Sequence, residues 1–182
     1  METRITMGQT PLFCQKALVE EIKELTKDML FQNPGGEDLI KLQVFSQSLP
    51  IPKRKETQTS GTGGNSIDYD GGELEEAVFK CPWCVVKVED GSITGINEGQ
   101  MVSVAIGFGI YNPDTENNGH EEILNLIQRV YGRFATNPLL DRQYTCNCEF
   151  EWALQEEDTY PYFFGAIGTV FKFRGFQREV IF

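Results

Sequence analysis

The most constraining feature of this sequence is a strict alternation over residues 101–110. Every second residue is apolar, and these are Val102, Val104, Ile106, Phe108 and Ile110. The residues between them are mostly small. A two-residue period places the apolar side chains on one face of a β-strand. The run therefore predicts a strand in a sheet that is covered on one side, which is typical of antiparallel sheets.

The same alternation predicts four further strands, at residues 40–44, 84–88, 144–154 and 167–174. The strand at 84–88 is expected to end at the turn Asp90-Gly91. Because a short loop containing glycine joins it to the 101–110 strand, the two predict an antiparallel hairpin. In the 144–154 strand, the apolar face is predicted to carry Tyr144, Cys146, Cys148, Phe150, Trp152 and Leu154.

Two segments carry apolar residues at helical spacing. The first runs from about residue 11 to 32, with Thr10 as the N-cap and Pro11 at the first helical position. The sequence Asn-Pro-Gly-Gly at 33–36 is expected to stop it. The second runs from about 120 to 135. Since each helix has one apolar stripe, the two can cover one face of the sheet.

These elements predict a single α+β domain over residues 1–182, with two layers: a mainly antiparallel sheet and two helices packed on one face. Residues 50–76 interrupt the pattern, because they are rich in glycine, proline and polar residues and contain few apolar ones. Such a segment does not bury enough apolar surface to offset its ordering entropy. We expect a long flexible loop within the domain.

Charge excludes several function classes. The chain has 27 acidic and 16 basic residues and a formal net charge of −11. Proteins that grip nucleic acid by its phosphates need a basic face, and anionic membranes repel an acidic chain. No apolar run approaches the ~18 residues of a membrane span. The N-terminal residues lack a signal-peptide pattern. We expect a soluble intracellular protein whose five cysteines are free thiols.

The cysteines suggest one alternative, a small zinc-binding protein using Cys81, Cys84, Cys146 and Cys148. Four thiolates can bind zinc, and the spacing of the first pair is the usual half-site. The second pair has only one residue between its members, and the alternation places it on an apolar strand face, where thiols pack as small hydrophobic groups. We therefore predict no metal and no cofactor.

Catalytic patterns are also weak. His120 is the only histidine and lies in a polar helix start, where a solvated side chain is expected. Glu149 and Glu151 share a predicted strand face, which is expected to be the solvated one. The glycines at 60–64 lack the Gly-Lys-Ser/Thr ending of a phosphate-binding loop. We predict that the chain is not an enzyme and has no catalytic residues.

Two features leave alternatives open. Gly107 and Gly109 indicate either strong local twist or close approach of a neighbouring backbone. The aromatic segment at 160–165 is expected either to complete the core or to provide interface anchors.

Several segments together are similar to tail terminator (tail completion) proteins of phages and prophages of Gram-positive bacteria. These segments are Leu-Pro-Ile-Pro at 49–52, the strands at 85–91 and 101–111, the helix containing 119–127, and residues 137–140, 150–155 and 160–165. The resemblance spans most of the chain and rests on structural motifs. The four cysteines of the zinc alternative are not part of it.

The resemblance implies a subunit of a ring, typically a hexamer, that caps the tail tube, stops its elongation and joins it to the head-side connector or neck protein. In contractile tails the ring also touches the sheath. DNA passes through without specific binding. The implied location is the tail-neck region of the virion, and the host cytoplasm during assembly. A head-completion or neck adaptor subunit is the alternative within this class.

Overall fold

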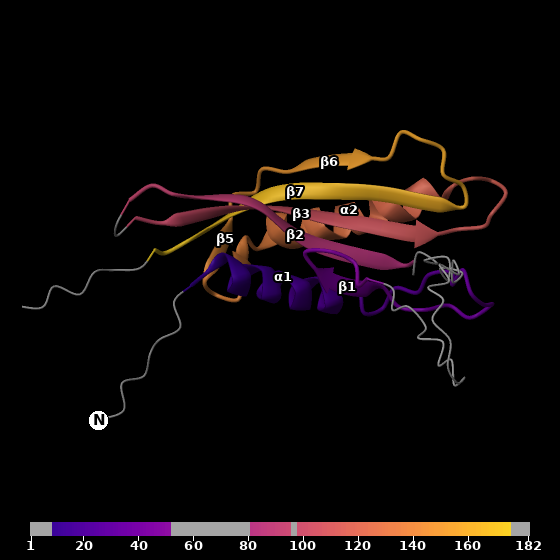
Figure 1. The fold of residues 1–182 in the computed structure, drawn as a ribbon, viewed down its shortest axis with the longest axis horizontal. Helices are drawn as coiled ribbons and strands as arrows, with labels where there is room; N and C mark the ends of the chain where they lie inside the picture. The colour runs from indigo at the N-terminus through magenta and orange to yellow at the C-terminus, as the bar shows by residue number, and fades with distance from the viewer. Residues whose placement is uncertain (1–8, 52–80, 96–97, 176–182) are drawn as a thin grey trace, which may run out of the picture.

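The computed structural model describes residues 9–51, 81–95 and 98–175. Within them lie two helices, α1 (Pro11–Leu25) and α2 (Gly119–Thr136). The strands are β1 (Gln43–Ser46), β2 (Trp83–Ile93), β3 (Gln100–Tyr111), β4 (Leu139–Leu140), β5 (Tyr144–Cys146), β6 (Glu151–Leu154) and β7 (Tyr162–Phe173). The predicted α+β class is confirmed (Figure 1).

The strands form one mixed, mainly antiparallel sheet. Its order is β1-β2-β3-β7-β5-β4, and β6 also pairs with β7. The predicted hairpin of β2 and β3 is present, and β3 pairs with β7 along its whole length. The exception to the antiparallel pattern is β1, which runs parallel to β2. At the end of the sheet opposite β1 lies β4. Both β5 and β6 pair with the side of β7 that faces away from β3.

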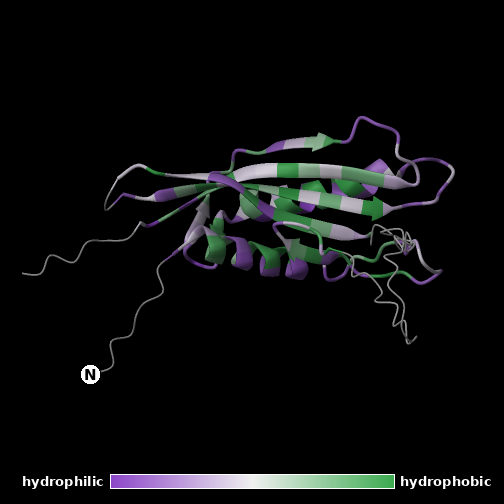
Figure 2. Cartoon of the chain, viewed as in Figure 1, coloured by the Kyte–Doolittle hydropathy of each residue, from purple (hydrophilic) through white to green (hydrophobic). Residues whose placement is uncertain are grey.

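Both helices pack on one face of this sheet, as predicted. The alternating apolar residues of β3 are all buried there, in one core with Leu18 and Ile22 of α1 and Ile127 and Phe134 of α2. Figure 2 shows the matching stripes of apolar and polar residues along the strands and the polar outer side of α1. The helix layer thus buries one sheet face and leaves the other without a covering helix in the described residues.

The first helix is shorter than predicted, ending at Leu25 instead of near residue 32. Thr26 is its C-cap, and the Thr26 hydroxyl donates a hydrogen bond to the Ile22 carbonyl, 2.8 Å away. The chain then turns, and Phe31 forms an isolated antiparallel bridge with Ile40. Phe31 is buried, so a tertiary contact replaces the continuation of the helix that its local pattern favoured. The second helix agrees with its prediction to within one residue at each end.

Three strand predictions were wrong at their ends. The strand expected at 40–44 lies at Gln43–Ser46 instead. The strand expected to end at Asp90-Gly91 continues to Ile93, because a bulge between Val88 and Asp90 absorbs the irregularity without ending the pairing. The last strand begins at Tyr162, five residues before the predicted start, so part of the aromatic segment belongs to the sheet.

The predicted strand over 144–154 is two strands, β5 and β6, separated by a break. Cys148 lies in this break with φ of 59°, a left-handed conformation that ends the regular alternation. Cys148 is therefore exposed, although the pattern placed it on the apolar face. Trp152 pairs with Ile167 and lies on the apolar face as predicted, but it is 59% exposed because β6 is at the edge of the sheet. Residues 52–76 of the loop predicted at 50–76 lie outside the described residues.

Candidate interaction surfaces

The two cysteine pairs of the zinc alternative lie far apart. Cys84 is opposite Phe108 of β3, which is opposite Gly165 of β7. Cys146 is opposite Phe171 of the same strand. Gly165 and Phe171 are six residues apart in β7, so these two positions are separated by roughly 20 Å along the strand. In the described ranges, no group of three or more histidine, cysteine or acidic side chains is arranged to hold a metal ion.

Burial also makes most of these thiols weak ligands and weak nucleophiles. Burial raises the pKa of Cys81 to about 12. Burial, together with the neighbouring Cys146, raises the pKa of Cys14 to about 12 as well. Burial also raises the pKa of Cys84 and the pKa of Cys146. Because the thiolate is the reactive form, these cysteines act as small apolar residues of the core.

The candidate catalytic residues are all exposed. His120 is exposed in the first turn of α2. Glu149 and Glu151 are exposed, but they do not share a regular strand face, since Glu149 lies in the break before β6. The glycines at 60–64 lie outside the described residues.

The close approach considered for Gly107 and Gly109 is made by a side chain. The indole of Trp83, from the neighbouring β2, lies on both glycines. A Cβ built on Gly109 would be 2.4 Å from the Trp83 ring, whereas one on Gly107 would meet it at 3.8 Å. The glycines therefore make room for a side chain, not for a backbone. No sequence signal links Trp83 to these positions, because the pairing is between strands.

The aromatic segment at 160–165 makes two kinds of contact. Phe163 packs against Gly119 at the start of α2, in contact with the core. Tyr162 contacts the ring of Tyr111 in the adjacent strand β3, with 5.4 Å between ring centroids. Phe164 contacts the ring of Trp83 in β2, across β3, with 5.9 Å between centroids. The first of the two alternatives, completion of the core, applies to Phe163.

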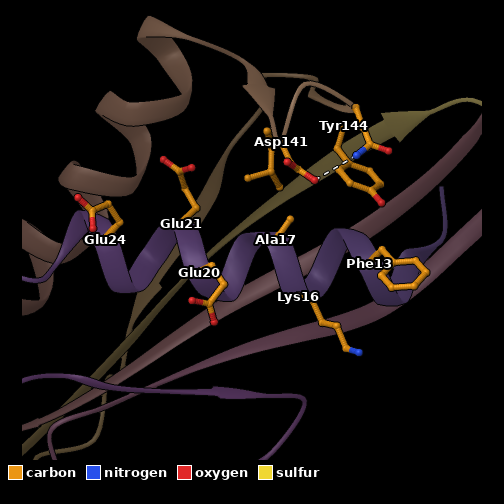
Figure 3. Close-up of a pocket in the computed structure, with 10 residues that line it drawn as sticks. Phe13, Lys16, Ala17, Glu20, Glu21, Glu24, Asp141 and Tyr144 are labelled. Atoms are coloured by element: carbon orange, nitrogen blue, oxygen red, sulfur yellow. Dashed lines mark hydrogen bonds between the residues drawn. The ribbon is translucent and has the colours of Figure 1, made fainter. Parts of the chain in front are cut away.

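One groove lies between α1 and the turn that joins β4 to β5. Its volume is about 610 Å³. Figure 3 shows Phe13 and Tyr144 at one end and acidic side chains of α1 toward the other. These acidic groups are paired within the protein: Glu20 with Lys23 at 2.7 Å, Glu24 with Lys27, and Glu21 with Arg133. The groove therefore has little net charge to attract a ligand.

A second groove, the β6 groove, lies between α2 and β6 and has a volume of about 530 Å³. From α2 it is lined by Leu124, Asn125, Ile127, Gln128 and Tyr131, and from the sheet side by Phe150, Trp152 and Ile167. Tyr131 and Phe150 stack edge to face at 5.4 Å. Trp152 is 59% exposed and Tyr131 is 44% exposed. Large exposed aromatic side chains around an apolar floor are characteristic of binding surfaces.

The sequence pattern did not reveal this surface because it placed Trp152 on an apolar strand face without showing that β6 is an edge strand. The signal that was available is the acidic composition around it: between Arg142 and Lys172 the chain has five acidic residues and no lysine or arginine.

Among the helices described, none is long and apolar enough to cross a membrane. No family model matches this chain, and no curated protein matches it either.

Proposed function

We propose that this protein is a structural subunit of a phage tail, a tail terminator that assembles with copies of itself into a ring. The ring caps the tail tube, stops its elongation and joins the tail to the head-side connector. Besides the resemblance in sequence, the observation that carries the proposal is the arrangement of the sheet's edges. Within the described residues, β1 closes one side of the sheet, and β4 and β6 close the other.

Edge strands present backbone N–H and C=O groups that are ready to pair with another chain. The two sides of this sheet are different: one is a parallel edge beside α1, and the other is an antiparallel edge beside the β6 groove. A subunit with two different edges on opposite sides favours a head-to-tail contact, and head-to-tail contacts generate rings when the rotation closes.

The charge of the chain supports the same function. A net charge of −11 opposes binding to the phosphates of DNA. A ring around passing DNA benefits from that, because an attractive lining would retard the passage. His120, Glu149 and Glu151 are exposed, which fits a role in which the shape of the assembly performs the function.

The test is imaging of particles assembled without this protein. We expect tubes of uncontrolled length that do not join heads, because nothing would stop addition of tube subunits. Restoring the protein should restore length and joining. A His120→Ala protein should restore them equally well. Closed tails of normal length that lack only heads would instead identify a neck adaptor, and normal infectious particles would reject both assignments.

A further inference from the structure

The β6 groove has three properties that together define what can bind there. The first is its apolar interior, formed by Leu124, Phe150 and Trp152, which the described part of the chain leaves open. Removing apolar surface of this kind from water favours association. The occupant must therefore carry apolar side chains.

The second property is a concentration of negative charge around β6. The exposed carboxylates are Glu149, Glu151, Glu156, Glu157 and Asp158. No ion pair between described residues involves any of them. This differs from the groove between α1 and the β4–β5 turn. There, Glu20, Glu21 and Glu24 form ion pairs with basic residues of the same molecule. The carboxylates around β6 lie along this strand and its flanking segments, outside the residues that line the groove, so an occupant gains from positive charge where it extends past the groove.

The third property is an unpaired strand edge. In the described ranges β6 pairs with β7 alone, so the other side of β6 presents backbone groups without a strand partner. An extended segment can add to such an edge by main-chain hydrogen bonds while its side chains enter the adjoining groove. The occupant is best matched by an extended peptide.

We propose that the β6 groove receives residues 49–55 of a second copy of this chain, an inference that rests on the proposed function. This segment reads Leu-Pro-Ile-Pro-Lys-Arg-Lys and contains the only run of three consecutive basic residues in the sequence. It supplies apolar anchors and adjacent positive charge, as the groove requires. Ile51, at the limit of the described residues, is 89% exposed and free of core contacts.

The prolines of this segment suit a strand that pairs on one side only. In a strand, alternate residues direct their backbone groups to opposite edges. Pro50 and Pro52 lack N–H groups and would occupy the outer edge, where no partner is needed. Leu49 and Ile51 would direct their N–H groups toward β6.

Geometry requires the contact to be between molecules. The segment follows β1, and β6 is four strand positions away across the sheet, or roughly 19 Å at ~4.8 Å per strand. Ile51 is five residues after Ser46, the last residue of β1, and can therefore lie at most ~18 Å from it when the chain is fully extended. The layer formed by α1 and α2 also occupies the helix face between the two edges. Each copy thus donates one segment and receives one, which produces a head-to-tail series.

The experiment titrates a fluorescently labelled peptide of residues 47–56 with the full-length chain. The fluorescence anisotropy of the peptide reports binding. Trp152→Ala should weaken binding about tenfold or more, because it removes the aromatic anchor. The double variant Glu149→Lys/Glu151→Lys should weaken it as well, and a peptide with Lys53→Glu, Arg54→Glu and Lys55→Glu should bind this variant better than the natural peptide does.

Matched controls place the same changes elsewhere. Ile93 is 70% exposed at the far end of β2, and Glu89 and Asp90 are exposed on the same strand. Ile93→Ala and Glu89→Lys/Asp90→Lys should leave binding unchanged. Absence of binding to the natural chain, or binding that is insensitive to the Trp152 and Glu149/Glu151 changes, would overturn the inference.

Tail imaging with the same variants separates this inference from the proposed function. Normal tails assembled from the Trp152→Ala, Glu149→Lys/Glu151→Lys chain would overturn the contact while leaving the terminator function intact. Specific peptide binding, combined with normal tails in the absence of the protein, would retain the contact and reject the function.

Discussion

The two tryptophans of this chain lie in strands of the same sheet but in opposite surroundings. Trp83, in β2, lies on Gly107 and Gly109 of β3 and contacts Phe164 of β7. Its Nε1 is buried and has no hydrogen-bond partner among the described residues. Trp152, in β6, is mostly exposed at the free edge of the sheet. We therefore expect the first region to stabilise the fold, and we propose the second as the region that binds a partner.

The thiols beside the two tryptophans provide the largest expected contrast. Cys84 next to Trp83 is fully buried, and burial raises the pKa of its thiol, whereas Cys148 near β6 is exposed. A thiol reagent reaches a buried cysteine only through local or global opening. We expect Cys84 to react at least about 1,000-fold more slowly than Cys148 in the native protein.

Mass spectrometry of timed labelling measures both rates. Cys148→Ser should remove the fast phase, and denaturant should expose the remaining thiols. Equal native rates at both cysteines would show that the Trp83 region opens as readily as the β6 edge.

Truncating each tryptophan tests the same contrast by stability. Trp83→Ala removes a ring packed on two glycines and should lower the free energy of unfolding by about 3 kcal/mol. Trp152→Ala removes an equally large side chain from an exposed edge and should lower it by less than about 1 kcal/mol. Urea denaturation followed by circular dichroism measures both. A Trp152→Ala loss as large as that of Trp83→Ala would contradict a recognition role.

The two glycines under Trp83 give a finer test. A Cβ on Gly109 would be 2.4 Å from the ring, so Gly109→Ala must displace the indole and should cost about 1–3 kcal/mol. At Gly107 the same Cβ would lie 3.8 Å from the ring. Because alanine loses less backbone entropy than glycine in a strand, Gly107→Ala should stabilise the protein by about 0.5 kcal/mol. Similar effects of both substitutions would contradict the packing of Trp83.

Elements with a sustained pattern were predictable from the sequence. The β2–β3 hairpin, the α2 helix and the α+β class follow from long runs of one period, in which many residues agree. The ends of elements were not. Thr26 ends α1 through its own hydroxyl, and Phe31 is held by Ile40, a contact between residues that no local pattern connects.

The surfaces were less predictable than the fold for a related reason. A period of two assigns Cys148 to the apolar face, but it does not reveal that Cys148 adopts positive φ and interrupts the strand. It assigns Trp152 to the correct face, but it does not reveal that β6 is an edge strand. It also gives no information on which strands are neighbours, so Gly109 and Trp83 were not connected. Exposure of an apolar residue depends on these long-range relations, and these decide where a partner can bind.

The smallest expected effect is spectroscopic and compares the two tryptophans directly. In a Trp152→Phe chain, emission comes from Trp83, whose ring lies on Gly107 and Gly109 and contacts Phe164, and it should be blue-shifted and weakly quenched by acrylamide. In a Trp83→Phe chain, emission comes from Trp152 and should be red-shifted and strongly quenched, because the ring is 59% exposed. Adding the peptide of residues 47–56 should protect Trp152 from quenching, since the peptide would cover the β6 groove, and should leave Trp83 unchanged. Protection of Trp83, or of both residues equally, would place the peptide elsewhere on the molecule and would remove the distinction between a stabilising and a recognition region.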